Sequence, residues 1–426
     1  MSDASGARAA APGLSLPAYG MWTSVFLAGF ILMVAYGVRL TVGLFVHPII
    51  MDKGLTIAEV STALAIGQIS WGLFQPLFGA WVDKGHAFAA LAVGALCIAA
   101  GQFLTMASDD VWILILAQGL FSPAGIAAGS FAILIGIVGG RIPPDKRSVA
   151  SGIINSGGSL GQFVFAPVVQ FCIQLRGYST SLAVLAAVAL AAVYPAWALC
   201  RRNPPVPRSE RHPDAFRPET PLAREGLREQ IRTALRDPSF LFLNAGFFTC
   251  GFHVAFLVTH LPGEVTACGH TAAVSAASIS LIGLCNIAGC IGAGILGKYY
   301  RMKNVLAVTY AARAVMIMLF IFSSKSELAF YVFSAATGFT WLATVPPTAG
   351  IVGKLFGQRY VATLFGLTFF THQIGGFFGA WLGGVAMETA GNLFWVWWVD
   401  VALASMAALV NLPIKEEAPR WRKAAA

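Results

Sequence analysis

Runs of about twenty apolar residues recur along the whole chain and limit what it can fold into. Because the hydrocarbon core of a bilayer is about 30 Å thick, each run is long enough to cross it as one helix. The composition agrees, since 57% of the 426 residues are hydrophobic and only 11% are charged, with a mean hydropathy of +0.72. A soluble domain carries about 25% charged residues. The sequence therefore predicts an integral membrane protein.

The apolar runs number twelve, and the alternating ten-residue pattern of a membrane β-barrel is missing from the sequence. The predicted helices cover residues 21–50, 58–82, 87–107, 111–140, 148–175, 179–200, 239–262, 273–297, 304–323, 327–352, 361–387 and 392–413. The predicted fold class is an all-α integral membrane protein with twelve transmembrane helices.

Lysine and arginine are distributed unequally between the two sides of these helices. If the N-terminus lies inside, 23 of the 28 basic residues fall on the inner side, and only Lys53, Arg176 and Lys325 fall outside. Arg39 and Arg313 lie within helices. The positive-inside rule then places both termini in the cytoplasm, and we expect a multi-pass protein of the bacterial inner membrane. The net charge of +9 reflects this topology and contact with membrane lipids, so no nucleic-acid partner is expected.

A charged segment, residues 201–236, divides the predicted helices six and six. Near its end Leu227, Ile231 and Leu235 fall on one helical stripe between arginines, which is typical of an amphipathic helix on the inner membrane surface or of a solvated linker helix. The predicted organisation is an N-terminal tail, a six-helix bundle, a cytoplasmic linker, a second six-helix bundle and a C-terminal tail: residues 1–20, 21–200, 201–236, 237–413 and 414–426.

The two halves of the sequence resemble each other at a nearly constant spacing. The recurring pairs are GAWVDKGH from Gly79 with GILGKYYR from Gly294, 215 residues apart, RSVAS from Arg147 with RYVAT from Arg359, 212 apart, and His47 with His260, 213 apart. Agreement on one spacing indicates a parallel duplication. We therefore expect two pseudo-symmetric bundles that face each other across a central cavity.

The loop after the second predicted helix carries a recognisable motif. Gly79, Asp83, Lys84 and Gly85 resemble the GxxxDRxGRR loop of the major facilitator superfamily, although His86 stands where a basic residue is usual. The resemblance covers essentially the whole chain. It implies the major facilitator fold, with these four residues in a loop that gates the conformational change.

A narrower resemblance concerns the fifth helix. KRSVASGIINSG, from Lys146 to Gly157, is similar to the fifth-helix signature of the monocarboxylate transporters and their oxalate/formate antiporter relatives. Arg39 falls where the first helix of that family carries a substrate-linked lysine. Asn286 and Cys290 stand where its eighth helix carries an acid and an arginine. The resemblance implies a divergent bacterial relative that moves a small organic anion, such as a monocarboxylate, with protons or by exchange.

Arg39 is the only formal charge between residues 21 and 51, and a charge at the bilayer centre costs about 2.5–3.5 kcal/mol. Glu59 and Asp400 are predicted near the outer ends of their helices, so no deep carboxylate is expected to pair with it. An anionic substrate would supply the missing counter-charge. The alternatives are hydrogen bonds to carbonyl groups or to Tyr36, or extension of the side chain to the membrane surface.

Other polar residues in the predicted helices are candidates for hydrogen bonds to a substrate or for carrying a proton. Candidates for substrate binding beside Arg39 are Tyr36, Asn155, Asn286 and Gln373. Candidates for proton coupling are His372 and, second, His253, although a simple structural hydrogen bond is the alternative for both.

Two features are expected to be structural. Arg313 lies on a helix that packs outside the cavity in this fold. Gly375, Gly379 and Gly383 recur every four residues and so allow close approach of a neighbouring helix.

The sequence carries no motif of a known enzyme class. HExxH, GxSxG, a phosphate-binding loop after a strand and metal-spaced Cys/His sets are all missing from it. We therefore expect no catalysis, no cofactor and no metal, and a monomer driven by a solute or ion gradient. The alternatives are an exporter of drugs or amphipathic metabolites and, from another class, a non-transporting membrane receptor.

Overall fold

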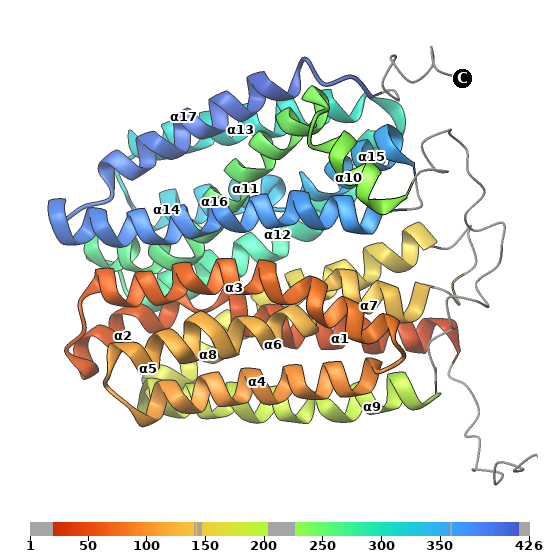
Figure 1. Ribbon diagram of the computed structural model, residues 1–426. Helices are drawn as coiled ribbons and strands as arrows, with labels where there is room; N and C mark the ends of the chain where they lie inside the picture. The colour runs from red at the N-terminus through yellow and green to blue at the C-terminus, as the bar shows by residue number, and fades with distance from the viewer. Residues whose placement is uncertain (1–19, 140–141, 143–146, 203–225, 358–359, 417–426) are drawn as a thin grey trace, which may run out of the picture.

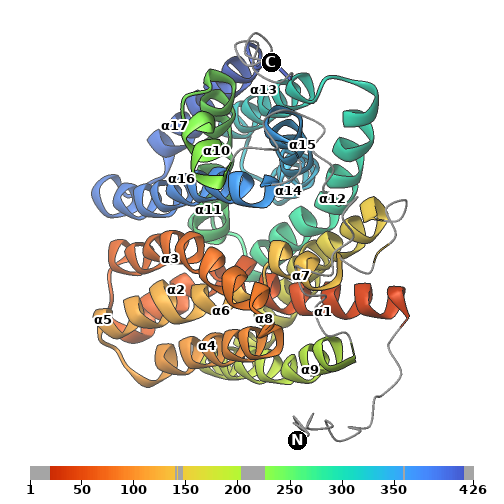
Figure 2. The same cartoon turned by 45° about the vertical axis from the view of Figure 1, so that its right-hand side comes forward.

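A computed structural model describes residues 20–139, 142, 147–202, 226–357 and 360–416. The helices form two groups, which we call the N-half (residues 20–202) and the C-half (residues 226–416). Figure 1 and Figure 2 show the N-half below the C-half, with α3 facing α16 across the boundary. Each half encloses its own core of buried apolar side chains.

The N-half holds the first six membrane crossings. Its elements are α1 (Met21–Leu40), α2 (Gly43–Lys53), α3 (Ile57–Asp83), α4 (Ala87–Ala107), α5 (Val111–Leu114), the π-helix η1 (Ile115–Phe121), α6 (Ser122–Ala128), α7 (Phe131–Val138), α8 (Arg147–Ala191) and α9 (Val193–Arg202).

The C-half holds the linker helix and the last six crossings. Its elements are α10 (Leu227–Ala234), α11 (Pro238–Ala267), α12 (Ala272–Tyr299), α13 (Met302–Ile321), α14 (Glu327–Thr340), α15 (Val345–Phe356), α16 (Val361–Ala390) and α17 (Phe394–Asn411).

The described residues contain ten helical segments long and apolar enough to span a membrane. One of them, residues 149–201, reverses direction at Arg176 and Gly177, where Gly177 has φ +82°, and therefore makes two crossings. With α16 the total is twelve. The described part of the chain contains no strand. The predicted all-α fold is therefore confirmed.

Local sequence explains where several crossings begin. Thr56 caps α3 through a reciprocal pair of bonds, since its hydroxyl accepts from the Glu59 amide and the Glu59 carboxylate accepts from the Thr56 amide. Asp237 caps α11 by accepting from the amides of Ser239 and Phe240. These bonds satisfy amide groups that have no partner inside the helix.

Four crossings are interrupted, which the apolar runs did not reveal. The first breaks between α1 and α2, where the Thr41 hydroxyl bonds back to the Gly37 carbonyl oxygen at 2.8 Å. The fourth contains η1, and π-helical turns are frequent at functional sites. The sixth breaks at Ala192, between α8 and α9. The tenth breaks at residues 341–344, between α14 and α15. Hydropathy could not detect these breaks because most residues through each of them are apolar.

The two halves touch along α3 with α16 and along α8 with α12, and α2 also meets α11. Gly43 of α2 approaches α11 so closely that a Cβ atom there would lie 2.0 Å from the Val258 carbonyl oxygen. Further hydrogen bonds join Ser280 to the Phe163 carbonyl at 2.8 Å and the Ala58 amide to Glu388 at 3.1 Å.

We call the side where α3 ends at Asp83 and α11 begins at Pro238 the linker face, and the other side the opposite face. The hydrogen bonds that join Ala58 to Glu388, Ser280 to Phe163 and Asn286 to Ser159 lie at mid-depth or toward the opposite face. The halves are therefore closed on the opposite face.

The glycine stripe of α16 meets α11. Cβ atoms at Gly375, Gly379 and Gly383 would lie 2.0 Å from the Phe248 carbonyl oxygen, 2.2 Å from the Phe252 carbonyl oxygen and 2.2 Å from the His260 ring. The two helices approach as closely as small residues allow.

The residues that the linker helix α10 buries differ from the predicted apolar stripe of Leu227, Ile231 and Leu235. Gln230, Thr233 and Ala234 are buried, and Ile231 packs against the core of the C-half. Leu227 and Leu235 remain 38% and 54% exposed. The rest of the linker, residues 203–225, lies outside the described residues.

Candidate functional site

A cavity of about 930 Å³, its mouth included, lies between the two halves. Both halves contribute to its wall, with α1, α3 and α8 on one side and α11, α12 and α16 on the other. Of the residues that the sequence singled out for binding or coupling, those in the wall are Tyr36, Arg39, Asn155, Asn286 and His372.

Aromatic rings connect the two sides of this cavity. Tyr36 meets Trp71 edge-on with 5.7 Å between centroids, and Trp71 meets Phe369 of α16 in the same way at 5.2 Å. Phe369 stacks on the His372 ring at 5.5 Å with 7° between the planes. Trp71 and Phe369, which sequence reasoning missed, therefore link Arg39 of the N-half to His372 of the C-half. Aromatic residues are common in apolar spans, so composition alone did not distinguish these two.

Arg39 reaches this aromatic row with its charge uncompensated. The guanidinium carbon lies 5.4 Å from the centroid of Trp71, and Arg39 makes neither a hydrogen bond nor an ion pair within the described chain. A cation–π contact of this kind contributes about 0.5–2 kcal/mol. That is less than the roughly 2.5–3.5 kcal/mol that a charge at this depth costs. Arg39 is therefore a cation without a counter-ion in the cavity wall.

His372 is similarly under-satisfied. Its Nδ1 is buried and has no hydrogen-bond partner in the described structure, and Phe247 closes over the ring with 4.9 Å between centroids. A neutral imidazole in this position is able to give or accept one hydrogen bond toward a ligand.

Asn286, in contrast, already has hydrogen-bond partners for its side-chain amide. Its amide nitrogen donates to Ser159 of the N-half at 2.8 Å, and its oxygen accepts from the Leu342 amide at 3.0 Å and from Cys290 at 3.2 Å. These bonds join the two halves to the broken tenth crossing. Asn286 therefore ties helices together at the edge of the cavity.

Two candidates lie outside the cavity wall. Gln373 is fully buried beside Gly72, where α16 meets α3, and neither atom of its amide group has a hydrogen-bond partner in the described residues. His253 is fully buried inside the C-half.

The expectation that no carboxylate lies deep in a span is wrong. Asp400 is fully buried, and its Oδ2 lies 2.5 Å from Nδ1 of His253, which is at the middle of α11. The predicted helix began at residue 392, which made Asp400 its ninth residue, so assigning Asp400 to the outer end underestimated its depth. In the structure it is the seventh residue of α17, about 9 Å along the axis at 1.5 Å per residue. Asp400 does not line the cavity.

Arg313 also belongs to this interior region. Its Nη2 donates to the carbonyl oxygens of Thr340 at 2.6 Å and Trp341 at 3.2 Å, at the start of the break in the tenth crossing. Its side chain is fully buried, and the structural role stays a prediction.

The loop motif after α3 lies on the linker face. Asp83 is the last residue of α3, Lys84 follows it, and Gly85 adopts φ +94°, a conformation that favours glycine. A Cβ at Gly79 would meet no atom within 4 Å. Its counterpart in the second half, GILGKYYR from Gly294, spans the end of α12.

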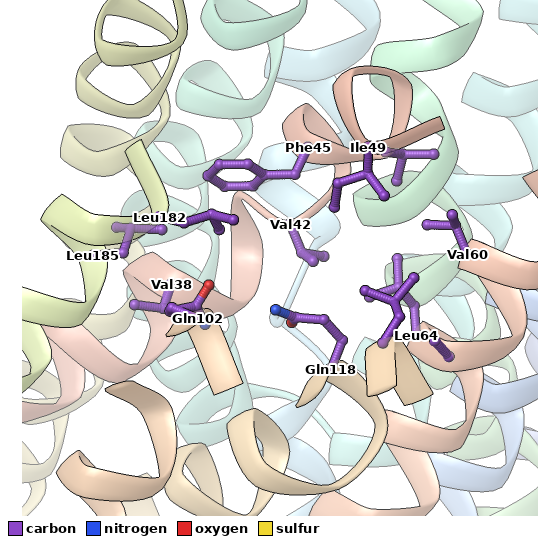
Figure 3. Close-up of a pocket in the computed structure, with 13 residues that line it drawn as sticks. Val38, Val42, Phe45, Ile49, Val60, Leu64, Gln102, Gln118, Leu182 and Leu185 are labelled. Carbon is purple, nitrogen blue, oxygen red and sulfur yellow. The ribbon is translucent and has the colours of Figure 1, made fainter. Parts of the chain in front are cut away.

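A second hollow of about 410 Å³ lies inside the N-half, where Figure 3 shows Gln102 and Gln118 among apolar side chains. Gln102 donates to Ser122 at 3.2 Å and Gln118 to Thr105 at 2.8 Å. Its lining carries no charge. The cavity between the halves, which has both a charge and unpaired polar groups, is therefore the better candidate for solute binding.

Comparisons with known proteins agree with this architecture. The family model of the Major Facilitator Superfamily matches residues 25–380. A crystal structure of a bacterial homologue of the human lysosomal transporter Spinster, inward-facing and unoccupied, covers 92% of this chain and 94% of its own, with a TM-score of 0.66 and 13% identity. That similarity concerns the fold.

Two curated relatives bear on the narrower resemblance. The oxalate:formate antiporter of Oxalobacter formigenes is 25% identical over 390 residues, covering 88% of this chain and 86% of the relative. Monocarboxylate transporter 13 of Bos taurus is 25% identical over 403 residues, covering 92% and 89%. The predicted resemblance to these two groups is confirmed, and the match points to a transporter and not to an enzyme. With the family model spanning most of its length, the chain belongs to the Major Facilitator Superfamily.

Proposed function

We propose that this protein is a secondary transporter of a small organic anion, most simply a monocarboxylate, which binds in the cavity between the two halves. The observation that carries the proposal is Arg39, a cation in the cavity wall with no counter-ion in the described structure. A planar guanidinium can hold a carboxylate through two hydrogen bonds. The names of the two relatives, an oxalate:formate antiporter and a monocarboxylate transporter, support the same substrate class.

The rest of the wall suits such a ligand. Trp71 and Phe369 offer an apolar surface for the non-carboxylate part, and His372 and Asn155 offer hydrogen bonds. A volume of about 930 Å³ is ample for a small acid, because small-molecule sites occupy about 300–1,000 Å³. Binding by both halves supports a mechanism in which the halves rock about the ligand.

The orientation follows from the charge distribution. If the linker face is cytoplasmic, as the excess of basic residues predicts, the halves are closed on the outer side in this structure. Reporters fused after residue 210 and at the C-terminus should then both report the cytoplasm. A periplasmic signal from either reporter would overturn this orientation.

Transport is tested by counterflow. Proteoliposomes loaded with an unlabelled carboxylate, chosen by a thermal-shift screen of mono- and dicarboxylates, should take up the labelled acid. A receptor would bind the acid without exchange.

An exporter of amphipathic cations remains the second candidate, because the cavity wall is rich in aromatic rings. Such a transporter would need a carboxylate in the wall, and among the described lining residues there is none. Stabilisation by cationic drugs, and not by carboxylates, would favour it.

A further inference from the structure

Three ionisable side chains from three helices lie within electrostatic reach of one another inside the C-half, apart from the cavity. They are Asp400 of α17, His253 of α11 and Arg313 of α13, and each is fully buried. Ionisable residues within membrane spans are costly and commonly mark ion or proton pathways. We call these three residues the buried triad.

The hydrogen bonds of the buried triad are incomplete. His253 Nδ1 pairs with Asp400 Oδ2 at 2.5 Å, which leaves Asp400 Oδ1 and His253 Nε2 without a partner in the described structure. Arg313 uses Nη2 alone, and its Nε and Nη1 are also unpartnered. A partly satisfied buried network stabilises a fold less than apolar residues of the same size. Stability alone is therefore a poor explanation for the triad.

One backbone segment connects the buried triad to the cavity. Trp341, in the break of the tenth crossing, lines the cavity and meets the His253 ring edge-on with 5.9 Å between centroids. The Trp341 carbonyl oxygen accepts from Arg313, and the next amide, of Leu342, donates to Asn286. A shift of this break as the halves move would change the surroundings of Arg313 and His253 together.

Asp400 is the one carboxylate that the described residues pair with His253. Other titratable groups on the helices packed around the triad include Tyr310 on α13, Cys250 on α11, Cys290 on α12 and His372 on α16. α11 also carries His260 and Glu264, which lie seven and eleven residues beyond His253, about 10 and 16 Å along the helix axis. With His253 neutral, the charges of Arg313 and Asp400 cancel, so the triad can gain one positive charge by binding one proton at the unpartnered Nε2. The imidazolium then stays paired with Asp400 through Nδ1.

We propose that the His253–Asp400 pair binds the proton that is transported together with the carboxylate, and that Arg313 helps to expel it when the break at residues 341–344 rearranges. This inference rests on the proposed function. The proton comes from the aqueous phase that supplies the carboxylate and leaves to the phase that receives it. The positive charge of one proton cancels the negative charge of one monocarboxylate. The net charge inside the membrane, to which Arg39, Arg313 and Asp400 contribute, is therefore the same in the loaded and the empty protein.

The first test uses the wild-type protein. In weakly buffered detergent solution, binding of the carboxylate that exchanges best should take up about one proton per molecule bound. Exchange in proteoliposomes without proton uptake on binding would overturn the inference and leave the proposed function standing. Failure of the wild type to exchange any carboxylate would remove the proposed function and this inference with it.

The second test compares Asp400→Asn with Glu327→Gln. Glu327 forms a carboxylate–histidine pair with His270 at 3.9 Å, but its side chain is 56% exposed, so it is a matched control. A gradient of one pH unit supplies about 1.4 kcal/mol per proton, which supports about tenfold accumulation. Asp400→Asn should lose this accumulation and keep counterflow at equal pH, while Glu327→Gln keeps both.

Accumulation by Asp400→Asn at the wild-type level would overturn the proposal. If Asp400→Asn folds poorly, His253→Gln serves the same comparison, and the wild-type proton measurement decides without any variant.

Discussion

The cavity wall of the N-half and the interior of the C-half each contain one arginine at mid-membrane. The two arginines differ in whether their guanidinium groups have hydrogen-bond partners. Arg313 donates to two backbone carbonyls and lies in the same buried triad as Asp400. Arg39 has only the face of Trp71 and an opening toward the cavity. An arginine within a membrane span is therefore not by itself a substrate site, and its partners decide whether it serves the fold or a ligand.

The largest expected effect follows from removing the buried arginine. Arg313→Met leaves the carbonyl oxygens of Thr340 and Trp341 without their charged donor, and each hydrogen bond to a charged group contributes about 1.5–3 kcal/mol. The variant should melt at a much lower temperature in detergent and give little folded protein. Arg39→Met removes the same charge from the cavity wall and should melt close to wild type. An equal fall in melting temperature in both variants would contradict the distinction between the two arginines.

A smaller effect is expected where the two halves are tied together. Asn286→Ala leaves the Ser159 hydroxyl and the Leu342 amide without their present partner, and a lost buried hydrogen bond costs about 1–3 kcal/mol. We expect a lower melting temperature with an unchanged affinity for the substrate. A normal melting temperature with weaker binding would instead make Asn286 a substrate ligand.

The smallest effect is expected at His372. If it gives one neutral hydrogen bond to the substrate, His372→Gln should weaken binding by about 0.5–1.5 kcal/mol, or two- to tenfold, because glutamine can replace that bond only in part. Accumulation driven by a pH gradient should persist. Its loss in His372→Gln, measured beside Asp400→Asn, would move the proton site from the buried triad to the cavity.

The sequence predicts the fold better than it predicts the site, for identifiable reasons. Long apolar runs are sufficient to find twelve crossings, because the bilayer requires each of them independently. Arg39 and His372 could be found because polar residues are rare in such runs. The pairing of Asp400 with His253 could not, since it depends on how α17 and α11 pack across 147 residues of sequence. Gln373 was assigned to substrate binding because the sequence predicts its helix but does not show which side of that helix faces the cavity.

The central claim is that Arg39 receives the carboxylate of the substrate. The decisive measurement is the binding affinity of the best carboxylate for purified wild type, Arg39→Lys and Arg39→Gln, after their melting temperatures are shown to be equal. A hydrogen bond to a charged group contributes about 1.5–3 kcal/mol, so Arg39→Gln should bind about 10- to 150-fold more weakly. Arg39→Lys should fall between the two, because lysine keeps the charge and loses the two-point geometry. Equal affinity in all three proteins would contradict the account and place any anion site elsewhere.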